Sequence, residues 1–380
     1  MNSSPTYFDA VIIGGGLAGL SLGIQLRRAG YRVLVIEKDE YPRHKVCGEY
    51  ISMESRPFLE RLGLPVMDMQ LPVIDQLLVT DVKGRALHAP LQPGGFGISR
   101  YMLDAELAQL FIDAGGELLT KTKVEQVVFE HGLFTIHTPK QQFTAKVAAG
   151  AWGKRSNIDI KQQRAFIQAQ KQSLNNYIGI KYHIRYEWPQ RQIALHNFEH
   201  GYCGISNVED GKVCLCYLTT AANLQRSGND IQQMEQSILR QNPELERIFA
   251  HAEFLWPQPQ VISQISFQRK EQVLDHVLLL GDAAGLITPL CGNGMSMAFH
   301  ASKLAFEAVH GFLAGRYNRD YMEDAYTIAW RKRFSMRLKA GRLLQANFGK
   351  NTTTSLMLGT LKLLPFLQQS LIRATFGKEF

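Results

Sequence analysis

A glycine pattern near the N-terminus lies between two different apolar periodicities. Residues 14–19 have the pattern G-x-G-x-x-G. The apolar run 9–13 before them predicts a buried strand, and the run 17–29 after them has the spacing of a helix. A second strand is expected at 32–36. A strand, a tight turn, a helix and another strand form a βαβ unit, so an α/β fold is expected.

Each glycine of this pattern has a physical task. Gly14 permits the tight turn, Gly16 lets a pyrophosphate approach the backbone, and Gly19 lets the helix pack closely on the strand. Amides at the helix N-terminus then bind the phosphates. Glu37 closes the second strand and is placed to accept hydrogen bonds from an adenosine ribose. A bound dinucleotide is therefore expected, the alternative being an ordinary turn.

A second glycine-bearing segment stands far along the chain. The apolar strand 277–280 is followed by Gly-Asp-Ala-Ala at 281–284, by Pro289, and by Gly-Asn-Gly at 292–294 before another helix. This repeats the strand, loop and helix order of the first unit. The chain is thus expected to leave the nucleotide-binding lobe and to return to it.

The two segments together resemble the FAD-dependent monooxygenase and geranylgeranyl reductase superfamily, with a fold like p-hydroxybenzoate hydroxylase, over most of the 380 residues. The resemblance implies an α/β protein with a Rossmann-like FAD-binding (GR2-type) domain, an inserted antiparallel β-sheet substrate domain and a C-terminal helical segment. We expect the FAD-binding domain in 1–75, 99–170 and 271–330, the substrate domain in 76–98 and 171–270, and the C-terminal helices in 331–380.

The middle of the chain has a two-residue period that suits the inserted sheet. In 176–186, Ile178, Ile180, Tyr182, Ile184 and Tyr186 share one face, and Gly179, Lys181, His183 and Arg185 share the other. This pattern predicts a half-buried antiparallel strand. A hairpin is expected from 204–208 and 213–218.

FAD is the expected cofactor, and its contacts are carried over onto matching positions. By resemblance Asp282 binds the ribityl chain, and the backbone at 292–294 lies near the flavin pyrimidine edge, where a helix N-terminus stabilises negative charge. Arg100 reaches the phosphate and ribityl region, the alternative being a salt bridge beside its own helix. The full expected set is Gly14, Gly16, Leu17, Ala18, Gly19, Glu37, Lys38, Arg43, Cys47, Gly48, Arg100, Gly281, Asp282, Pro289, Gly292, Asn293 and Gly294.

Residues 41–49 resemble the proline to Cys-Gly segment of the geranylgeranyl reductase branch. The resemblance puts this segment beside the flavin and makes Cys47 and Lys45 candidate catalytic residues. The alternative is a surface loop with a buried cysteine. At 150–156, Trp152 replaces an aspartate that hydroxylases carry, which puts in doubt any transfer of nicotinamide-binding roles.

Cysteine and histidine suggest no metal site. The five cysteines are an odd number without a disulfide spacing, which favours a reducing cytoplasm. Cys214 and Cys216 point to one face of a strand and Cys203 could lie near them, but three thiols without a fourth ligand make a poor zinc site. His183 and His196 could act as acids or bases, although strand histidines are usually only hydrogen-bonded.

The net charge of +8 is compatible with a nucleic acid partner, an anionic membrane surface or an anionic cofactor. No nucleic-acid-binding module accompanies it, so we expect no nucleic acid partner. The first ten residues lack the features of an export signal, and no run of about 20 apolar residues predicts a spanning helix. The helical C-terminal segment is basic and rich in leucine over 356–372. It either packs on the flavin lobe or touches the inner face of a membrane peripherally, as would suit a lipid substrate.

Three functions remain open from the sequence. The first is an FAD-dependent monooxygenase of an apolar aromatic or polyketide-like molecule, which uses electrons derived from NAD(P)H. The second is a carbon–carbon double-bond reductase of a prenyl or lipid substrate, and the third is a non-catalytic electron carrier or membrane-associated binding protein. No second G-x-G-x-x-G lobe is present, so NAD(P)H is expected to bind transiently or a separate protein to donate electrons. Halogenation is disfavoured because the chain has no Trp-x-Trp-x-Ile-Pro segment.

Overall fold

The first lobe is a mixed sheet whose parallel centre is built around the glycine-bearing unit. The computed structural model describes residues 5–172, 176–347 and 349–380, so the first four residues lie outside it. β1 (Thr6–Ile13) pairs in parallel with β2 (Val33–Ile36) on one side and with β9 (Gln142–Gly150) on the other. The sheet order is β16-β17-β9-β1-β2-β6, and β8 pairs with both β7 and β9. The remaining strands are β6 (Glu117–Leu119), β7 (Gln126–Glu130), β8 (Leu133–His137), β16 (Val273–Leu274) and β17 (Val277–Leu279).

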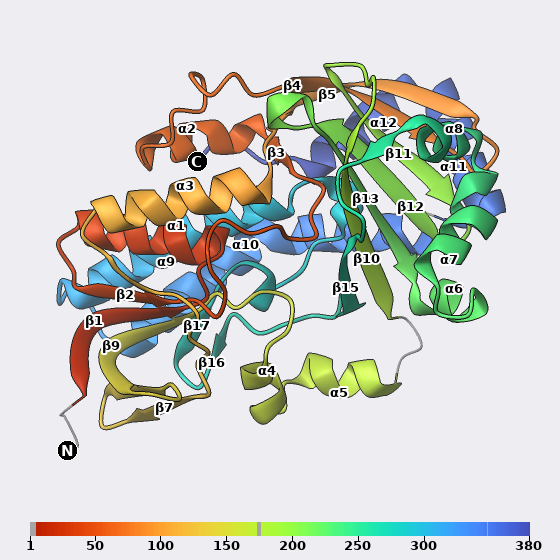
Figure 1. The fold of residues 1–380 in the computed structure, drawn as a ribbon. Helices are drawn as coiled ribbons and strands as arrows, with labels where there is room; N and C mark the ends of the chain where they lie inside the picture. The colour runs from red at the N-terminus through yellow and green to blue at the C-terminus, as the bar shows by residue number, and fades with distance from the viewer. Residues whose placement is uncertain (1–4, 173–175, 348) are drawn as a thin grey trace.

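Long helices cover this sheet. α1 (Leu17–Arg28) contacts α3 (Arg100–Asp113) on one side and α9 (Gly294–Leu313) on the other, and α10 (Arg319–Asn347) packs on α9 (Figure 1). α3 begins where Ser99 Oγ accepts a hydrogen bond from the Met102 amide at 3.1 Å, as an N-cap serine does. β2 is buried along its whole length because it has neighbours on both edges and a helix above it. The predicted βαβ unit is confirmed.

The second lobe is a larger sheet. Its strands come from separate stretches of the chain, between stretches that belong to the first sheet. Its order is β14-β10-β13-β12-β11-β4-β5-β3, with β15 paired to β10. The hairpin of β12 and β13 is antiparallel as predicted, but β11 and β4 are parallel, since a long excursion through the first lobe separates them. The strands are β3 (Tyr50–Ser52), β4 (Val73–Thr80), β5 (Ala86–Gly97), β10 (Tyr177–Arg185), β11 (Gln192–Phe198), β12 (Gly201–Asn207), β13 (Val213–Thr220), β14 (Glu253–Phe254) and β15 (Gln260–Ile265).

The prediction that β10 is half-buried is wrong. Its apolar face, with Ile180 and Tyr182, packs into a cluster with the helices that follow β13. Its polar face is buried as well, since Lys181 and His183 are almost wholly inaccessible to solvent. The reason is that the loop 41–49 of the first lobe lies against this face, where Lys181 donates a hydrogen bond to the Lys45 carbonyl.

Shorter helices complete the two lobes, and the chain ends in helices. α7 and α8 pack on the apolar face of β10, and α11 and α12 lie beside β5 at the blue end of the chain in Figure 1. No helix in the described ranges is both long and apolar enough to cross a bilayer. The bounds are α2 (Arg56–Arg61), α4 (Asn157–Lys161), α5 (Ala165–Gln172), α6 (Ala221–Arg226), α7 (Ile231–Ser237), α8 (Pro243–His251), α11 (Asn351–Leu363) and α12 (Pro365–Thr375), with single 3-10 turns η1 (Met53–Ser55), η2 (Glu209–Gly211), η3 (Leu239–Gln241), η4 (Gly281–Ala283) and η5 (Pro289–Cys291).

The proposed domain limits remain predictions, although several elements cross them, among them β4 at 75/76 and α5 at 170/171. β3 belongs to the second sheet but falls within 1–75, and α10 begins at Arg319, before the expected C-terminal segment.

The close packing of α1 on β1 gives a test of the role of Gly19. A Cβ at this position would lie 2.1 Å from the Gly14 carbonyl oxygen, so Gly19→Ala should destabilise the fold by about 1–3 kcal/mol through overpacking. Gly359→Ala is the matched control, because Gly359 is also helical and its Cβ would meet nothing within 4 Å. The control should be neutral or slightly stabilising. Thermal unfolding measures both, and equal midpoints for the two variants would contradict the packing argument.

Candidate functional site

The N-terminus of α1 faces two cations. Gly16 is its N-cap residue, and the first turn holds no acidic side chain and no side-chain cap. A Cβ at Gly16 would lie 3.6 Å from Lys45 Nζ and 3.9 Å from a terminal nitrogen of Arg100. A helix N-terminus, an ammonium and a guanidinium thus converge on one point, as a pyrophosphate requires. This part of the chain fits the phosphates of a dinucleotide.

A buried carboxylate holds these two cations in place. Arg100 binds Asp104 through two hydrogen bonds of 2.7 and 2.9 Å, and Lys45 Nζ lies 3.2 Å from the same carboxylate. Burial alone would raise the pKa of Asp104, but the charges of Arg100 and Lys45 outweigh it and lower the pKa. Burial lowers the pKa of Lys45, and Asp104 opposes that shift. Arg100 therefore forms the salt bridge beside its own helix that was the alternative prediction. Its guanidinium also faces Gly16.

Glu37 binds the turn in front of it. Its carboxylate accepts hydrogen bonds from the Gly15 amide at 2.7 Å and from Arg43 at 2.7 Å. Burial would raise the pKa of Glu37, but the hydrogen bond and charge of Arg43, with the charge of Lys45, hold the pKa at about 2. Arg43 thus lies against Glu37, and Lys38 is exposed outside this group. A ribose contact of Glu37 stays a prediction.

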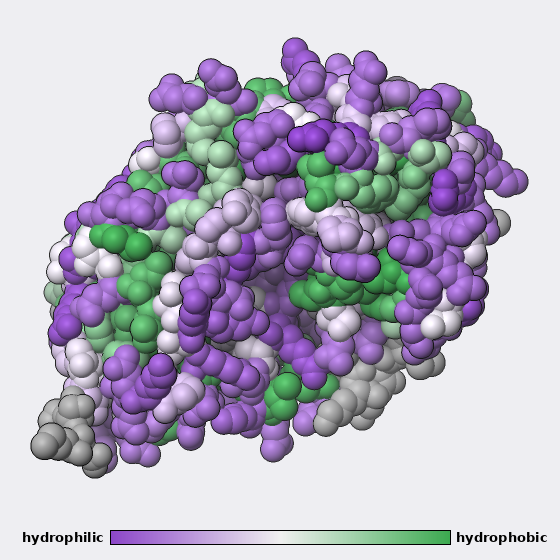
Figure 2. Space-filling view, in the orientation of Figure 1, coloured by the Kyte–Doolittle hydropathy of each residue, from purple (hydrophilic) through white to green (hydrophobic). Residues whose placement is uncertain are grey.

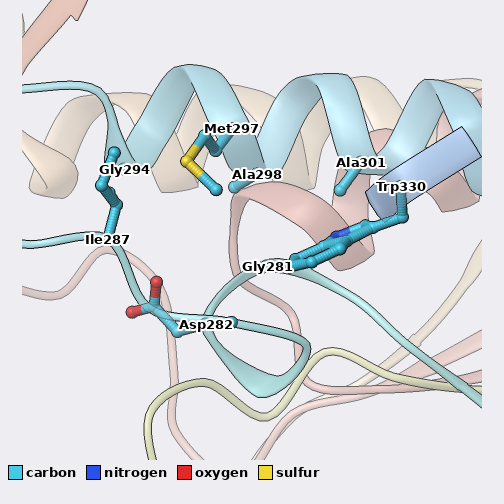
Figure 3. Close-up of a pocket in the computed structure, with 9 residues that line it drawn as sticks. Gly281, Asp282, Ile287, Gly294, Met297, Ala298, Ala301 and Trp330 are labelled. Atoms are coloured by element: carbon cyan, nitrogen blue, oxygen red, sulfur yellow. The ribbon is translucent and has the colours of Figure 1, made fainter. Parts of the chain in front are cut away.

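The second glycine-bearing segment meets the first. A Cβ on Gly281 would lie 3.3 Å from Ala18 Cβ, so residues more than 250 positions apart are neighbours. The Asp282 carboxylate points toward Ile287 and Gly294 at the start of α9, and the Trp330 ring lies on the other side of Gly281 (Figure 3). The cavity among these residues holds about 10 Å³, which suits one water molecule at most. Asp282 is therefore directed at the same helix end that the sequence assigned to the flavin.

Buried polar atoms at the start of α9 lack partners. Asn293 Oδ1, Ser296 Oγ and the Tyr50 hydroxyl have no hydrogen-bond partner in the part of the chain that the structure describes. Gly292, with φ of +64°, lies against the Tyr50 ring, which a Cβ would approach to 3.2 Å. Such orphaned groups are rare in native proteins and indicate a missing ligand or water. A flavin ring, which has donors and acceptors along its pyrimidine edge, fits them.

Two basic residues that the sequence interpretation missed hold the backbone of this segment. Lys270 Nζ donates hydrogen bonds to the carbonyls of Asp282 and Lys154, both at 2.8 Å. Arg164 donates to the Ala283 carbonyl at 3.0 Å while it pairs with the buried Asp159 at 2.8 Å. Burial lowers the pKa of Lys270 to about 8. No local pattern marks either residue, because both act through backbone carbonyls that only the fold brings near.

Loop 41–49 is held to the second sheet by a buried ionic group. Glu49 accepts hydrogen bonds from Lys181 Nζ and, at 2.7 Å, from the Arg100 amide, and its second oxygen lies 2.6 Å from His183 Nε2. Burial would raise the pKa of Glu49, but the charge of Lys181 outweighs it and lowers the pKa. Burial would likewise lower the pKa of Lys181, and Glu49 raises it instead. The alternating polar positions of β10 were the only sequence signal for this group.

Cys47 lies directly above this ionic group. Its carbonyl accepts a weak hydrogen bond from Cys214 Sγ at 3.4 Å, and its own Sγ, which is partly exposed, accepts one from the Glu49 amide at 3.5 Å. The next residue, Gly48, is exposed. Loop 41–49 therefore connects the two sheets and packs against the second one, so it is more than a surface loop. Whether Cys47 or Lys45 acts in catalysis stays a prediction.

Three residues in and beside this ionic group lie close enough together to bind a metal ion. Ligand atoms of Glu49, His183 and Cys214 lie within 4.8 Å of one another. However, the Lys181 ammonium already binds the carboxylate and balances its charge. A metal ion would have to displace a buried ammonium, so we assign no metal here.

The other residues singled out from the sequence lie in different places. His44 stacks on Tyr101 with ring centroids 4.6 Å apart and contacts Trp256, and burial lowers its pKa to about 4, so it is neutral at pH 7. His196 lies outside the site beside Thr80, at 2.9 Å. Cys203 packs into the apolar cluster on the opposite face of the sheet from Cys214. Trp152 donates a hydrogen bond to Asp159 at 3.0 Å.

Comparison with known proteins agrees with this geometry. The family described as FAD binding domain matches residues 9–46. Over 334 residues the chain is 25% identical to conditioned medium factor receptor 1 of Dictyostelium discoideum, which covers 79% of this chain but only 62% of that protein. It is 24% identical to a 1H-pyrrole-2-carbonyl-[peptidyl-carrier protein] brominase of Pseudoalteromonas luteoviolacea, with coverages of 81% and 78%. It is also 24% identical to digeranylgeranylglycerophospholipid reductase 2 of Methanothermobacter thermautotrophicus, with coverages of 87% and 85%.

Solved structures show the same fold. The flavin-dependent brominase Bmp2 superposes with a TM-score of 0.80 at 20% identity and covers 97% of this chain and 93% of its own. A geranylgeranyl bacteriochlorophyll reductase-like protein of Thermoplasma acidophilum has a TM-score of 0.79 at 16% identity, with coverages of 99% and 97%. PqsL of Pseudomonas aeruginosa, solved with 2-aminobenzoylacetate, has a TM-score of 0.73 at 16% identity, with coverages of 92% and 98%. Flavoproteins of different reactions thus share this architecture.

The buried ionic group generates a stability prediction. Lys181→Met leaves the Glu49 charge buried without its main partner and should lower the free energy of unfolding by about 3–5 kcal/mol. Arg185→Met on the same strand is the control, since Arg185 and Glu253 are 68% and 63% exposed and such pairs contribute about 0–1 kcal/mol. Denaturant unfolding compares them, and the double variant Lys181→Met with Glu49→Gln should recover part of the loss. A Lys181→Met variant as stable as Arg185→Met would show that the ion pair has no structural role.

Proposed function

We propose that this chain, which has the fold of the FAD-dependent monooxygenase and geranylgeranyl reductase superfamily, is a monooxygenase of an apolar aromatic or polyketide-like small molecule. One observation carries its assignment as an FAD-dependent oxidoreductase. The α1 N-terminus, Lys45 and Arg100 share one point, and the loop that carries Asp282 packs against α1 next to it. The expected residues that meet there belong to segments far apart in the sequence, which chance would rarely bring together.

The residues of this chain divide the work of holding the cofactor. Lys45, Arg100 and the amides of α1 would bind the pyrophosphate, and Asp282 would bind the ribityl chain. Lys270 and Arg164 hold the carbonyls of Asp282 and Ala283 and so prevent the loop from moving away. When bound, FAD supplies the redox chemistry, and the protein supplies position, shielding and charge.

The proposed substrate region is apolar. Tyr202 and Leu218 of the second sheet pack with Ile265 and with Leu286 and Leu290 of the loop before α9. This cluster joins the second sheet to the flavin-facing loop and keeps water from that side, as oxygen chemistry requires. On the face shown in Figure 2, a hollow bordered mainly by hydrophilic residues lies between the two lobes, with a hydrophobic area on the side of the second sheet. An apolar molecule that enters there would meet the second sheet and the loop 41–49 together.

A double-bond reductase is the second candidate. It is favoured by the likeness to the digeranylgeranylglycerophospholipid reductase, which extends over most of both chains, and by the segment 41–49.

The electron donor is proposed to be NAD(P)H bound transiently, or a separate protein. We also place the protein in the reducing cytoplasm, since the four cysteines whose side chains are described, Cys47, Cys203, Cys214 and Cys216, are unpaired.

Isotopically labelled dioxygen separates the candidate reactions. With a turning-over substrate, the proposal predicts one labelled oxygen atom in the product and oxygen consumption that matches product formation. Mass spectrometry of the product measures this. A reduced product formed without oxygen consumption would overturn the proposal in favour of the reductase, and a halogenated product without label would assign the reaction of the brominase relative. Oxygen consumption that no tested substrate stimulates would favour the non-catalytic electron carrier.

Removal of the Asp282 carboxylate tests the cofactor site. Asp282→Ala should give colourless protein or bind FAD at least about tenfold more weakly, because a hydrogen bond to a charged group is worth roughly 1.5–3 kcal/mol. Asp68→Ala is the control, since Asp68 is exposed on the loop after α2. Absorbance at the flavin band and titration with FAD measure the effect. Full flavin occupancy in Asp282→Ala would show that this loop does not bind the cofactor.

A further inference from the structure

The corner between α11 and α12 is an exposed apolar surface. Residues 363–367 are Leu-Leu-Pro-Phe-Leu, and every one of them is exposed. Leu363 and Phe366 have 82% and 74% of their surface accessible to solvent. Elsewhere in the described ranges, exposed large apolar side chains never stand next to each other in the chain. Single exposed leucines are ordinary, but a continuous run indicates a binding surface.

This corner is held firmly by the helices on both of its sides. Before it, Leu358 packs with Val79 and Leu87 of the second sheet. After it, Gln368 donates a hydrogen bond to the His88 carbonyl at 3.0 Å, and Ile372 packs beside Tyr50 and Leu91. One side of α11 and α12 is therefore docked on β4 and β5, and the corner points away from that contact. The apolar run is a rigid projection of the fold.

The charge of the surrounding segment has one sign. Residues 325–378 contain ten lysines and arginines and no aspartate or glutamate, whereas the rest of the chain has 32 basic and 34 acidic residues. The whole positive excess of the protein thus lies in this segment. One of the ten, Arg337, is buried against Glu54, but Lys362 beside the corner, Arg373 in the last turn of α12 and Lys350 before α11 are exposed. An apolar tip next to an exposed lysine, in a segment whose charges are all positive, is complementary to an anionic lipid surface.

We infer that residues 363–367 insert into the interfacial region of a membrane that contains anionic phospholipid, with Lys362 at the headgroups and the positive charge of residues 325–378 adding attraction to the surface. Neither α11 nor α12 is long enough to cross a bilayer, so the contact is peripheral. Each apolar side chain gains by leaving water, and each cation gains from the negative surface potential. Both contributions are needed, because single weak signals give only marginal membrane binding. The inference does not depend on which reaction the flavin site performs.

Sedimentation with vesicles tests this inference on the full-length protein. The protein should sediment with vesicles of phosphatidylcholine and phosphatidylglycerol, and at least about tenfold less with phosphatidylcholine alone. Leu363→Gln with Phe366→Gln should reduce the binding to anionic vesicles by at least about tenfold. The matched control is Met67→Gln with Ile112→Gln, which removes two exposed apolar side chains from the first lobe and should change nothing.

Two further measurements make each outcome decisive. Lys362→Gln with Arg373→Gln should weaken the preference for anionic vesicles, and high salt should abolish it. Light scattering of the free protein should give the same mass for the parent chain and the Leu363→Gln, Phe366→Gln variant. Absence of binding to anionic vesicles, or equal binding by the corner variant, would overturn the inference. A larger mass that only the corner variant loses, without vesicle binding, would assign the surface to a second copy of the chain instead.

Discussion

The buried contact between Glu49 and Lys181 joins the two sheets of this protein. Glu49 ends the loop that leaves the glycine-bearing unit, and Lys181 stands in the middle of a strand of the other sheet. Since an unpaired charge in this position would be very costly, the pair favours the arrangement in which loop 41–49 lies against the strand of Lys181. That arrangement also fixes the carbonyls of Lys45 and Cys47, which Lys181 and Cys214 bind. The geometry of the site next to the second sheet therefore depends on a contact between loop 41–49 and that sheet.

The first lobe was predictable because its chemistry is local. Gly14, Gly16 and Gly19 act through backbone conformation and close approach, and both properties depend on residue type and spacing alone. The spacing of apolar residues before and after these glycines also depends only on the local sequence, so it predicts the strands and the helix clearly. The structure adds that Gly16 faces Lys45 and Arg100, which no spacing could reveal. The approach of Gly281 to Ala18 could be expected only by resemblance, since it joins segments more than 250 residues apart.

The second lobe was harder to predict, because its burial depends on contacts with the first. The alternation in β10 correctly separated Ile180 from Lys181, but it could not show that a distant loop covers the polar side. Lys270 and Arg164 were missed because each binds a carbonyl, and carbonyls are present at every residue. A lysine that anchors a loop and a lysine in water look the same in a sequence. Only the fold distinguishes them, through burial and through the partner it supplies.

The end of α12 touches the flavin side of the molecule. Asn293, at the start of α9, donates a hydrogen bond to the Thr375 carbonyl, and Phe376 packs with Tyr50 in the same apolar cluster as Ile372. One wall of the proposed flavin region thus belongs to the helix whose other end carries the exposed corner. Any force that shifts α12 also shifts this wall, and thermodynamic linkage makes the effect mutual. Occupancy of the proposed flavin site and attachment at the proposed membrane corner would then be linked through α12, and vesicle binding would be expected to change the flavin spectrum.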